Sequence, residues 1–339
     1  MKAWQTVSVG DPKDALVLNP DAPEPEPYPG TVLLEVQAAG VGLPDVLMCK
    51  DAYAMTPQRP FTQGQEVVGR IVGWGEGVEN RNVGDRVMAV TSFFTGAGSY
   101  AEKCLALDDF CLPVPDEMSD AEGAAFLIPF HTAYLGLETR AALKPDETLL
   151  VLGGAGGTGS AALQVGKALG AKAIAVVAGP EKVEFCKRLG ADLVIDRREA
   201  DIAEAVMAET AGQGANVIYD PVGGDAFTRA TKCVAHEGRI LAVGFASGQW
   251  GQVETAHMVM QNYSVIGVIP TNYGREYKEA AQERLLAWYR SGQLTVEIDE
   301  LVPFDALPDA LERLGNNEVK GKLAIAVSAD ATTRSAKDA

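Results

Sequence analysis

Residues Thr148–Gly159 read TLLVLGGAGGTG, an apolar run followed at once by a glycine-rich turn. The run Thr148–Leu152 predicts a buried strand, and Gly157–Leu169 predicts a helix that starts inside the turn. Gly154–Gly159 matches the pattern G-x-G-x-x-G, whose glycines let the backbone turn tightly and approach a pyrophosphate at the N-terminus of the helix. A glycine-rich turn alone is weak evidence, but this strand–turn–helix order favours a dinucleotide-binding site.

The sequence after this turn repeats the same strand–helix rhythm. Strands alternate there with helices at lengths typical of βαβ units, which predicts a parallel sheet. With the first strand, the sheet would be a complete doubly wound nucleotide-binding sheet. The further strands are predicted at Ala173–Ala178, Leu193–Ile195, Asn216–Tyr219, Arg239–Val243 and Ser264–Ile269, and the helices at Glu181–Leu189, Ile202–Thr210 and Asp225–Val234.

The regions on either side of this sheet have a different texture. Short strands such as Thr31–Val36, Val67–Val72 and Arg86–Val90 are separated by turns rich in Gly and Pro, which indicates a compact β-barrel. Beyond Pro270 the rhythm breaks, and the chain is expected to return to the first domain. We therefore expect an α/β protein with a barrel domain of residues 1–119 and 270–327, an inserted domain of residues 120–269, and a frayed polar tail at 328–339.

The end of the second strand of the inserted domain indicates which dinucleotide would bind. NAD enzymes usually carry an Asp or Glu there to hold the ribose 2′-OH, whereas this strand ends in Val177-Ala178-Gly179-Pro180. Glu181 follows, but acids are favoured in the first turn of any helix. Lys182 and Arg197 would suit the extra phosphate of NADP, so we expect NADP, although each cation alone could equally be an ordinary solvated charge.

The composition is that of an acidic, enzyme-sized protein. The 339 residues carry a formal net charge of −17, which disfavours nucleic-acid partners because such a surface repels phosphate backbones. The sequence contains no run of about 18 apolar residues, so no transmembrane helix is predicted. Its first residues lack the apolar core of a signal peptide. The 5 cysteines are far apart and odd in number, which argues against a disulfide framework and favours a reduced, cytoplasmic protein.

Short segments of the chain match one enzyme family in their order and spacing: Ala38–Val41, Asp45–Met48, Pro60–Glu66, Gly84–Val87, Thr132–Tyr134, Gly154–Gly159 and Asp220–Gly224. Each is weak alone, but together they resemble, almost from end to end, the zinc-free quinone oxidoreductase branch of the medium-chain dehydrogenase/reductase superfamily. The resemblance implies a GroES-like barrel domain, an inserted NADP-binding Rossmann domain, and an active site in the cleft between them. It also implies a homodimer formed through the sheet edge near Ser264–Ile269.

The resemblance also allows the zinc question to be examined position by position. Catalytic zinc needs three protein ligands and an open position. Where zinc alcohol dehydrogenases of this superfamily carry Cys, His and Cys, this chain has Gly42, Gln65 and Ile128. The structural four-cysteine lobe is missing as well, because Phe93–Tyr100 contains no cysteine. Glu66 remains, but one carboxylate is not a zinc site, so we expect no metal.

Without a Lewis acid, polarising a simple carbonyl is hard. A quinone or an α,β-unsaturated carbonyl needs less help, because hydride enters a delocalised system that the protein need only position. The sequence therefore predicts hydride transfer from NADPH to a conjugated acceptor, with no obligatory protein nucleophile and with the second proton coming from water. An enoyl or alkenal double-bond reductase, even one for CoA thioesters, stays open, and so does a non-catalytic NADPH-binding protein.

The candidate catalytic residues come from the resemblance. Thr132 matches the threonine beside the nicotinamide, although a helix hydroxyl could instead bond its own backbone. Tyr53 matches a pocket tyrosine that orients or protonates substrate, although an exposed loop tyrosine is an equal alternative. The full set expected at the cofactor is Thr132, Gly154, Gly156, Gly157, Thr158, Gly159, Gly179, Lys182, Arg197, Val222, Val243, Phe245, Ala246, Ser247, Ile269 and Asn317.

Two further groups of residues remain: the three histidines, and three positions at which the chain departs from the family pattern. His131 could act as an acid, since histidine titrates near neutral pH, but a structural role is the alternative. His236 and His257 are interpreted as surface helix residues. The chain departs from many relatives at Gly42, where Asn is common, and at Lys50 and Asp51, where Arg and Gly are usual; these departures leave the acceptor open.

Overall fold

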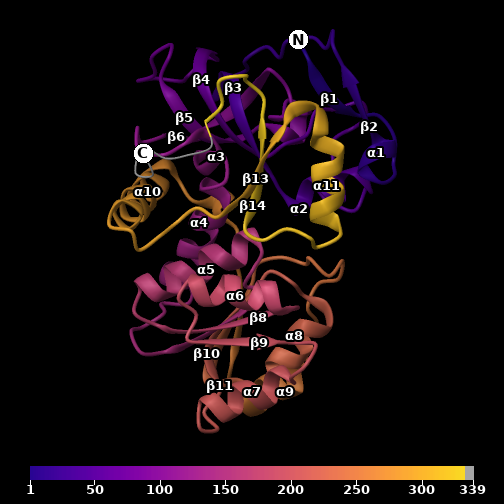
Figure 1. The fold of residues 1–339 in the computed structure, drawn as a ribbon. Coiled ribbons are helices and arrows are strands. Elements are labelled where there is room, and N and C mark those ends of the chain that lie inside the picture. The colour runs from indigo at the N-terminus through magenta and orange to yellow at the C-terminus, as the bar shows by residue number, and fades with distance from the viewer. Residues whose placement is uncertain (333–339) are drawn as a thin grey trace. The chain divides into compact units, whose positions relative to one another are not determined.

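The computed structural model describes residues 1–332 and divides into two compact units (Figure 1). Unit 1 comprises Met1–Ile128, Gly274–Glu279 and the chain from Val296 onwards, and unit 2 comprises Pro129–Tyr273 and Ala280–Thr295. Each unit is built on a six-stranded sheet of its own. Within the described residues, no helix is long and apolar enough to cross a membrane.

Unit 1 is a mainly antiparallel, barrel-like sheet with strand order β13-β14-β3-β4-β5-β6. Strand β3 pairs with β4 along one edge and with β6 and then β14 along the other, so the sheet curls around it. Val32, Leu34 and Val36 of β3 lie in the apolar core. The strands are β1 (Ala3–Thr6), β2 (Leu16–Asn19), β3 (Thr31–Val41), β4 (Glu66–Trp74), β5 (Arg86–Thr91), β6 (Lys103–Pro113), β13 (Ile298–Pro303) and β14 (Lys322–Ala326), and the helices are α1 (Pro12–Ala15), α2 (Leu43–Cys49), α3 (Asp120–Gly123) and α11 (Leu307–Gly315).

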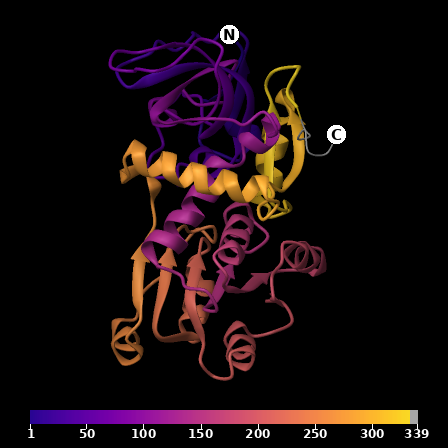
Figure 2. The same cartoon turned by 90° about the vertical axis from the view of Figure 1, so that its left-hand side faces the viewer.

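Unit 2 is a parallel sheet with order β12-β11-β10-β7-β8-β9, in which β12 is an edge strand (Figure 2). On one face, Ile202 of α7 and Phe227 of α8 pack against strand residues such as Ile218. Its strands are β7 (Thr148–Leu152), β8 (Lys172–Val177), β9 (Leu193–Asp196), β10 (Ala215–Asp220), β11 (Val234–Ala242) and β12 (Ser264–Gly267), and its helices are α5 (Gly157–Ala168), α6 (Pro180–Arg188), α7 (Ile202–Glu209), α8 (Gly224–Thr231) and α9 (Thr255–Gln261). Helices α4 (Leu127–Tyr134) and α10 (Arg275–Arg290) belong partly to each unit.

The predicted fold class is confirmed: an α/β chain carries a barrel-like sheet and an inserted, doubly wound parallel sheet. The largest difference is at β11, which begins at Val234, whereas the sequence predicted that the helix before it continues to that residue. The chain leaves α8 at Thr231 because Val234 pairs with Ala215 of β10. His236 is therefore exposed, as predicted, but it lies in a strand and not in a helix.

The unit boundaries differ from the predicted ones at 119/120 and at 269/270. Unit 2 begins only at Pro129, and it takes up Ala280–Thr295 from the region expected to return to the barrel. Side-chain contacts explain the second difference: His131 Nε2 lies 2.8 Å from Gln282 Oε1, and the ring centroids of Tyr134 and Trp288 are 6.0 Å apart. These contacts tie the second half of α10 to α4.

The prediction of a loose tail is wrong for residues 328–332, and residues 333–339 lie outside the described part of the chain. Thr332 is fastened to α3, because its N–H and hydroxyl both lie 2.9 Å from Asp120 Oδ2. In return, the N–H of Ala121 donates to the Thr332 carbonyl oxygen at 3.1 Å. Arg86 holds the other oxygen of Asp120 at 2.6 Å, so one buried carboxylate joins three segments of unit 1.

Candidate functional site

The glycine turn between β7 and α5 has room for a ligand at one glycine and none at another. A Cβ on Gly159 would lie 2.2 Å from the Gly153 carbonyl oxygen, so this glycine is needed for close packing of helix on strand. A Cβ on Gly156 would meet nothing nearer than 3.5 Å, and Gly156 is exposed. Gly156 is also the N-cap of α5 and has no capping side chain, so the first N–H groups of the helix are open to an anion.

The loops after β10 and β11 lie together next to this turn. Val222 Cγ2 would be 3.0 Å from a Cβ on Gly153, which places the β10 loop against the glycine turn. The N–H groups of Ala246 and Ser247 donate to the carbonyl oxygens of Pro221 and Val222 at 3.0 and 2.9 Å. The structure therefore brings the following predicted cofactor residues together at the carboxyl edge of one sheet: Gly154, Gly156, Gly157, Thr158, Gly159, Val222, Val243, Phe245, Ala246 and Ser247.

Asp220 shapes the second of these loops, and the sequence interpretation did not single it out. Its Oδ1 accepts the N–H groups of Val222 and Gly223 at 2.9 and 2.8 Å, which fixes the turn after β10. Burial raises the pKa of Asp220, and these two hydrogen bonds oppose the rise. The signal in the sequence was Asp-Pro followed by Gly-Gly, because an Asp side chain readily accepts from the backbone two residues on.

The tip of β8 does carry an acid, supplied by the neighbouring strand. Asp196 ends β9 opposite Val177, and its Oδ2 accepts the N–H of Gly179 at 2.9 Å while its Oδ1 accepts that of Arg198 at 3.0 Å. Both carboxylate oxygens are thus engaged by backbone. Gly179 itself has a φ of 97°, a conformation that favours glycine. Strand β8, the second strand of unit 2 along the chain, has no acid of its own, as the sequence showed.

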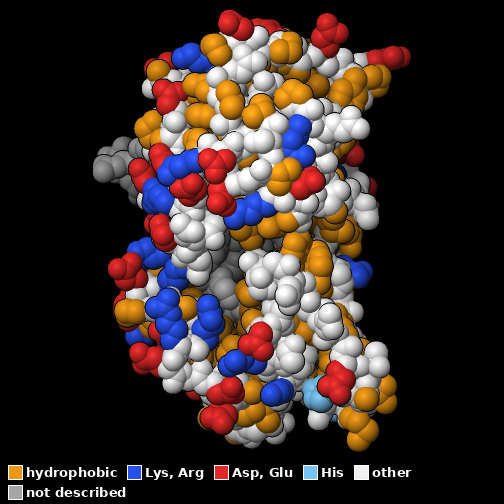
Figure 3. All heavy atoms as spheres, turned by 90° about the vertical axis from the view of Figure 1, so that its right-hand side faces the viewer, with side chains coloured by type: hydrophobic (Ala, Val, Ile, Leu, Met, Phe, Trp, Pro, Cys, Tyr) orange, Lys and Arg blue, Asp and Glu red, His pale blue; other side chains and the backbone are white. Residues whose placement is uncertain are grey.

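The basic side chain over this tip is Arg198. A Cβ on Gly179 would lie 3.2 Å from Arg198 Nη1, so the guanidinium lies directly above the turn. For the predicted Arg197, the structure gives a backbone contact, its N–H donating to the Val177 carbonyl oxygen at 3.0 Å. Lys182 is half-buried in α6. Burial raises the pKa of the neighbouring Cys186 to about 12, and the charge of Lys182 opposes the rise. Figure 3 shows Lys and Arg side chains gathered on one side of unit 2, although the chain as a whole is acidic.

Helix α4 holds two of the candidate side chains in unit 2. Thr132 is only 6 % exposed, and His131 is 4 % exposed. The ring of His131 shares a hydrogen bond with Gln282, which supports the structural role over the acid role. Ile269, by contrast, is 54 % exposed just after the edge strand β12. Asn317 belongs to unit 1, in a left-handed turn with φ of 61° after α11.

Unit 1 contains a buried carboxyl group three residues after Gly42. Asp45 accepts hydrogen bonds from the N–H of Gly42 at 2.9 Å, the N–H of Gly64 at 3.2 Å and the hydroxyl of Tyr100 at 2.9 Å. Burial raises the pKa of Asp45 to about 6, and the hydrogen bonds oppose this rise. A Cβ on Gly42 would lie 3.3 Å from Asp45 Oδ2, so a side chain at this position would press against the carboxyl group.

Tyr53 follows α2 and is partly buried against an apolar cluster of Met48, Phe61 and Phe93. Its ring centroid lies 6.4 Å from that of Phe93. Burial raises the pKa of Tyr53, and the neighbouring Gln65 amide opposes the rise. The sequence had singled out Gln65 only as a missing zinc ligand.

The remaining positions considered for zinc are used in other ways. The Glu66 carboxylate pairs with Lys322 Nζ at 2.6 Å and accepts the N–H of Ile128 at 2.9 Å, all three being in unit 1. Nowhere in residues 1–332 do three or more His, Cys, Asp or Glu side chains form a group that could hold a metal ion. Whether the protein binds zinc in solution stays a prediction.

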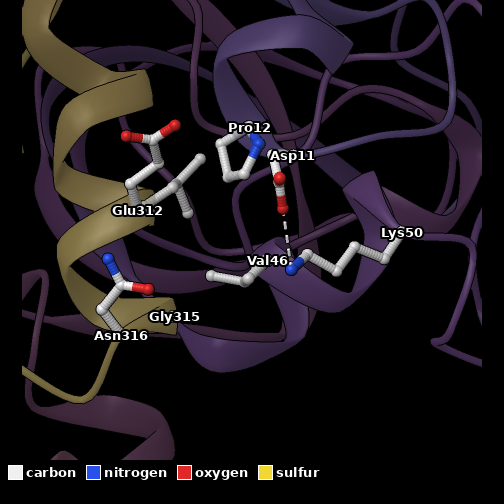
Figure 4. Close-up of a pocket in the computed structure, with 8 residues that line it drawn as sticks. Asp11, Pro12, Val46, Lys50, Glu312, Gly315 and Asn316 are labelled. Carbon is white, nitrogen blue, oxygen red and sulfur yellow. Dashed lines mark ion pairs between the residues drawn. The ribbon is translucent and has the colours of Figure 1, made fainter.

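The departures at Lys50 and Asp51 have local explanations. Lys50 Nζ pairs with Asp11 at 2.9 Å in a pocket of about 240 Å³ between α1, α2 and α11, whose lining contains neither Tyr53 nor Gln65 (Figure 4). Asp51 has a φ of 57°, the left-handed conformation that would favour the usual glycine and that Asp tolerates. Its carboxylate accepts Arg59 Nη2 at 3.1 Å.

Comparison with known families matches both parts of the chain. Residues 28–116 match the family model described as alcohol dehydrogenase GroES-like domain, and residues 157–286 match the one described as zinc-binding dehydrogenase. Among curated proteins, quinone oxidoreductase-like protein 2 of Bos taurus is 31 % identical over 319 residues, which cover 93 % of this chain and 90 % of the relative.

Two solved structures are similar over nearly the whole chain. One, described as a "probable oxidoreductase" from Mycobacterium abscessus, has a TM-score of 0.84 and 35 % identity and covers 96 % of this chain and 98 % of its own. The other is the Escherichia coli quinone oxidoreductase complexed with NADPH, with a TM-score of 0.88, 27 % identity, and coverage of 96 % of this chain and 100 % of its own.

Proposed function

This chain belongs to the quinone oxidoreductase type of the medium-chain dehydrogenase/reductase family, and on that premise we propose that it is an NADPH-dependent reductase of quinones or other conjugated carbonyl compounds. The observation that carries the proposal is the turn between β7 and α5, where Gly156 is open and the helix N-terminus is uncapped. A pyrophosphate fits such a cradle, because it is an anion that the helix N–H groups and dipole attract.

All but one of the residues proposed to bind the cofactor belong to unit 2, and the exception, Asn317, belongs to unit 1. The turn Gly154–Gly159 would hold the pyrophosphate, and Thr132, with Val222 and the loop Val243–Ser247, would line the nicotinamide. Lys182, Arg197 and, as the geometry over Gly179 supports, Arg198 would hold the 2′-phosphate. Ile269 and Asn317 complete the proposed set. When bound, NADPH supplies a hydride.

The acceptor class is proposed from the chemistry of the positions that could have held zinc. Gly42, Gln65 and Ile128 offer no metal ligands, so a carbonyl oxygen would meet hydrogen-bond donors rather than a Lewis acid. A conjugated acceptor suits such a site, because the charge that arrives with hydride is delocalised. Tyr53 in unit 1 is the proposed contact that orients this acceptor.

The test is NADPH oxidation, followed at 340 nm, with 1,2-naphthoquinone, a 2-alkenal and an enoyl-CoA thioester. Turnover of the quinone supports the proposal. Turnover of the thioester alone would replace it with an enoyl reductase, and tight NADPH binding with no turnover of any acceptor would favour a non-catalytic NADPH-binding protein. Metal analysis of the purified protein that finds about one zinc per chain would contradict the zinc-free mechanism.

We also propose that the protein is a cytoplasmic homodimer that pairs through the edge of the parallel sheet. Strand β12 is an edge strand, and an unpaired edge is a ready template for a second copy. Val259 and Met260 of the adjoining α9 are 67 % and 79 % exposed, which is unusual for large apolar side chains on one short helix. All five cysteines are free and buried, which suits a reducing compartment.

A further inference from the structure

Within unit 1, the side chain of Gln65 has an unused hydrogen-bond donor. Its Nε2 is buried and makes no hydrogen bond of normal geometry with any described residue. Leaving a buried amide donor unpaired costs about 1–3 kcal/mol, so such a group in a native structure calls for a partner. The Gln65 amide lies beside the Tyr53 hydroxyl, which makes two donors available at one place.

The backbone holds Gln65 firmly in this position. The Gln65 carbonyl oxygen accepts the N–H of Thr91 at 2.9 Å, and the Thr91 hydroxyl donates to the Gly64 carbonyl oxygen at 2.6 Å. The N–H of Gly64 is held in turn by Asp45. The backbone here cannot easily move, because Gln65 is bonded to Thr91 of β5, and its neighbour Gly64 is bonded to Thr91 and to Asp45 of α2.

The nearest acid in the chain is not available to satisfy the Gln65 amide. Glu66 has one carboxylate oxygen on Lys322 and the other on the N–H of Ile128. Gln63, the other glutamine of this segment, differs from Gln65 in burial and in pairing. It is fully buried, and its Nε2 donates to Cys49 Sγ at 3.1 Å. Gln65 keeps partial exposure as a residue, whereas Gln63 has none, so of the two side chains that of Gln65 lies nearer the surface.

The surroundings of this donor pair are apolar and aromatic on one side. Tyr53 packs against Met48, Phe61 and Phe93, and the rings of Phe93 and Phe94 meet edge to face at 5.7 Å. Phe94 is 38 % exposed. A flat conjugated molecule fits such a wall, because aromatic faces and edges attract one another.

We propose that Gln65 Nε2 donates a hydrogen bond to the carbonyl oxygen of the acceptor and, together with Tyr53, stabilises the negative charge that this oxygen gains during reduction. The proposal rests on the reductase activity proposed above. In the step, hydride from NADPH forms a bond to the acceptor, the carbonyl π electrons move to the oxygen, and NADP⁺ is left. Water then protonates the oxygen or the carbon conjugated to it. A donor aimed at a developing oxyanion is a common source of rate enhancement.

The variant Gln65→Met keeps the length of the side chain and removes the donor. It should lower kcat for naphthoquinones about 10- to 100-fold, since a hydrogen bond to a charged group contributes about 1.5–3 kcal/mol. The dissociation constant of NADPH, measured by its fluorescence, should stay within twofold. Gln65→His, assayed with EDTA present, should recover much of the lost rate, because an imidazole N–H can donate in place of the amide.

The matched control is Gln37→Met. Gln37 is also partly exposed, also in unit 1, and also has one unpartnered buried amide atom, in this case its acceptor Oε1. Its kcat should stay within twofold of the wild type. If Gln37→Met loses as much activity as Gln65→Met, or if Gln65→Met retains wild-type kcat, the proposed role of Gln65 is wrong.

A series of acceptors separates a chemical role from a structural one. The loss in Gln65→Met should be larger for 2-methyl-1,4-naphthoquinone than for 1,4-naphthoquinone, because the methylated ring stabilises the arriving charge less well by itself. An equal loss for both would indicate a packing defect and overturn the proposal. A wild-type protein that reduces none of these acceptors would instead overturn the proposed function, so the two failures can be told apart.

A readout without turnover comes from 4-nitrophenol, a mimic of the reduced product whose visible band reports its ionised form. Gln65 should stabilise the bound phenolate, so the pKa of the bound phenol should be about 1–2 units lower in the wild type than in Gln65→Met. Equal pKa values in the two proteins would contradict a donor at the acceptor oxygen.

Discussion

At the scale of single residues, the carboxyl group of Asp45 has an unusually high pKa. It is 1 % exposed, and the pKa of about 6 lies well above the value of 3.8 for a free Asp. Between pH 3.8 and about pH 6, the folded protein therefore holds a proton on Asp45 that the unfolded chain has released. The resulting stability is fully present below pH 4 and is lost as the pH rises through about 6.

The replacement Asp45→Asn removes this pH dependence. Between pH 4 and pH 7, the free energy of unfolding of the wild type should fall by about 2 kcal/mol more than that of the variant, because this interval covers most of the shift of about two pKa units. Urea denaturation at both pH values measures it. Asp21→Asn, which changes an exposed carboxylate, should keep the wild-type slope; equal slopes in Asp45→Asn and the wild type would contradict the raised pKa.

Arg198 makes a second prediction at this scale, because its guanidinium and not that of the neighbouring Arg197 is seen over Gly179. Arg198→Ala should raise KM for NADPH about tenfold or more and leave KM for NADH nearly unchanged, since a charge-assisted hydrogen bond to phosphate is lost. Arg197→Ala, at the other arginine proposed for the 2′-phosphate, should have the smaller effect because no atom of Arg197 lies near Gly179 as Arg198 does. A larger effect of Arg197 on the ratio of the two KM values would restore the original assignment.

At the scale of elements, the turn between β7 and α5 was predictable because its information is local. Strand, glycines and helix follow one another in the chain, and the two glycine roles depend on backbone geometry alone. Asp196 and Arg198 could not be found in this way, since their position depends on how β9 is registered against β8. The start of β11 was missed for a similar reason: its pairing with β10 overrides a sequence that is typical of a helix end.

Two alanine substitutions separate the roles of the glycines in this turn. Gly156→Ala should keep the wild-type Tm, because its Cβ meets no atom within 3.4 Å, yet it should weaken NADPH binding at least tenfold by filling the cradle. Gly159→Ala should lower Tm, because its Cβ would lie 2.2 Å from a carbonyl oxygen. Calorimetry and NADPH fluorescence titration test both; unchanged NADPH affinity in Gly156→Ala would exclude this turn as the pyrophosphate site.

At the scale of the whole molecule, the sequence predicted that one sheet is inserted in the chain of the other, but not the contacts inside each unit. The alternation of strands and helices indicated an inserted sheet, whereas the transfer of Ala280–Thr295 to unit 2 depends on the pairing of His131 with Gln282. The docking of Thr332 depends on Asp120, which is far away in the sequence. Gln65 was visible only as a missing ligand, since the state of its amide depends on its neighbours in space.

The homodimer is the prediction that concerns the whole molecule. Met260→Glu should shift the mass measured by light scattering towards that of one chain, 35.8 kDa, because it places a charge in an apolar contact. Val83→Glu, at a valine of unit 1 that is 68 % exposed, should leave the mass unchanged. A wild-type protein that already has the mass of one chain would refute the dimer.

The pairing of β14 with β3 has a consequence for synthesis on the ribosome. On the edge of β3 that does not face β4, residues Ala38–Val41 pair with Leu323–Ala326, which follow unit 2 in the sequence. At about 5–20 residues per second, the nascent chain therefore carries an open strand edge for roughly 15–60 s. Chaperones that shield unpaired strands would act on this protein during that interval, after the inserted sheet has been translated and before the barrel can close.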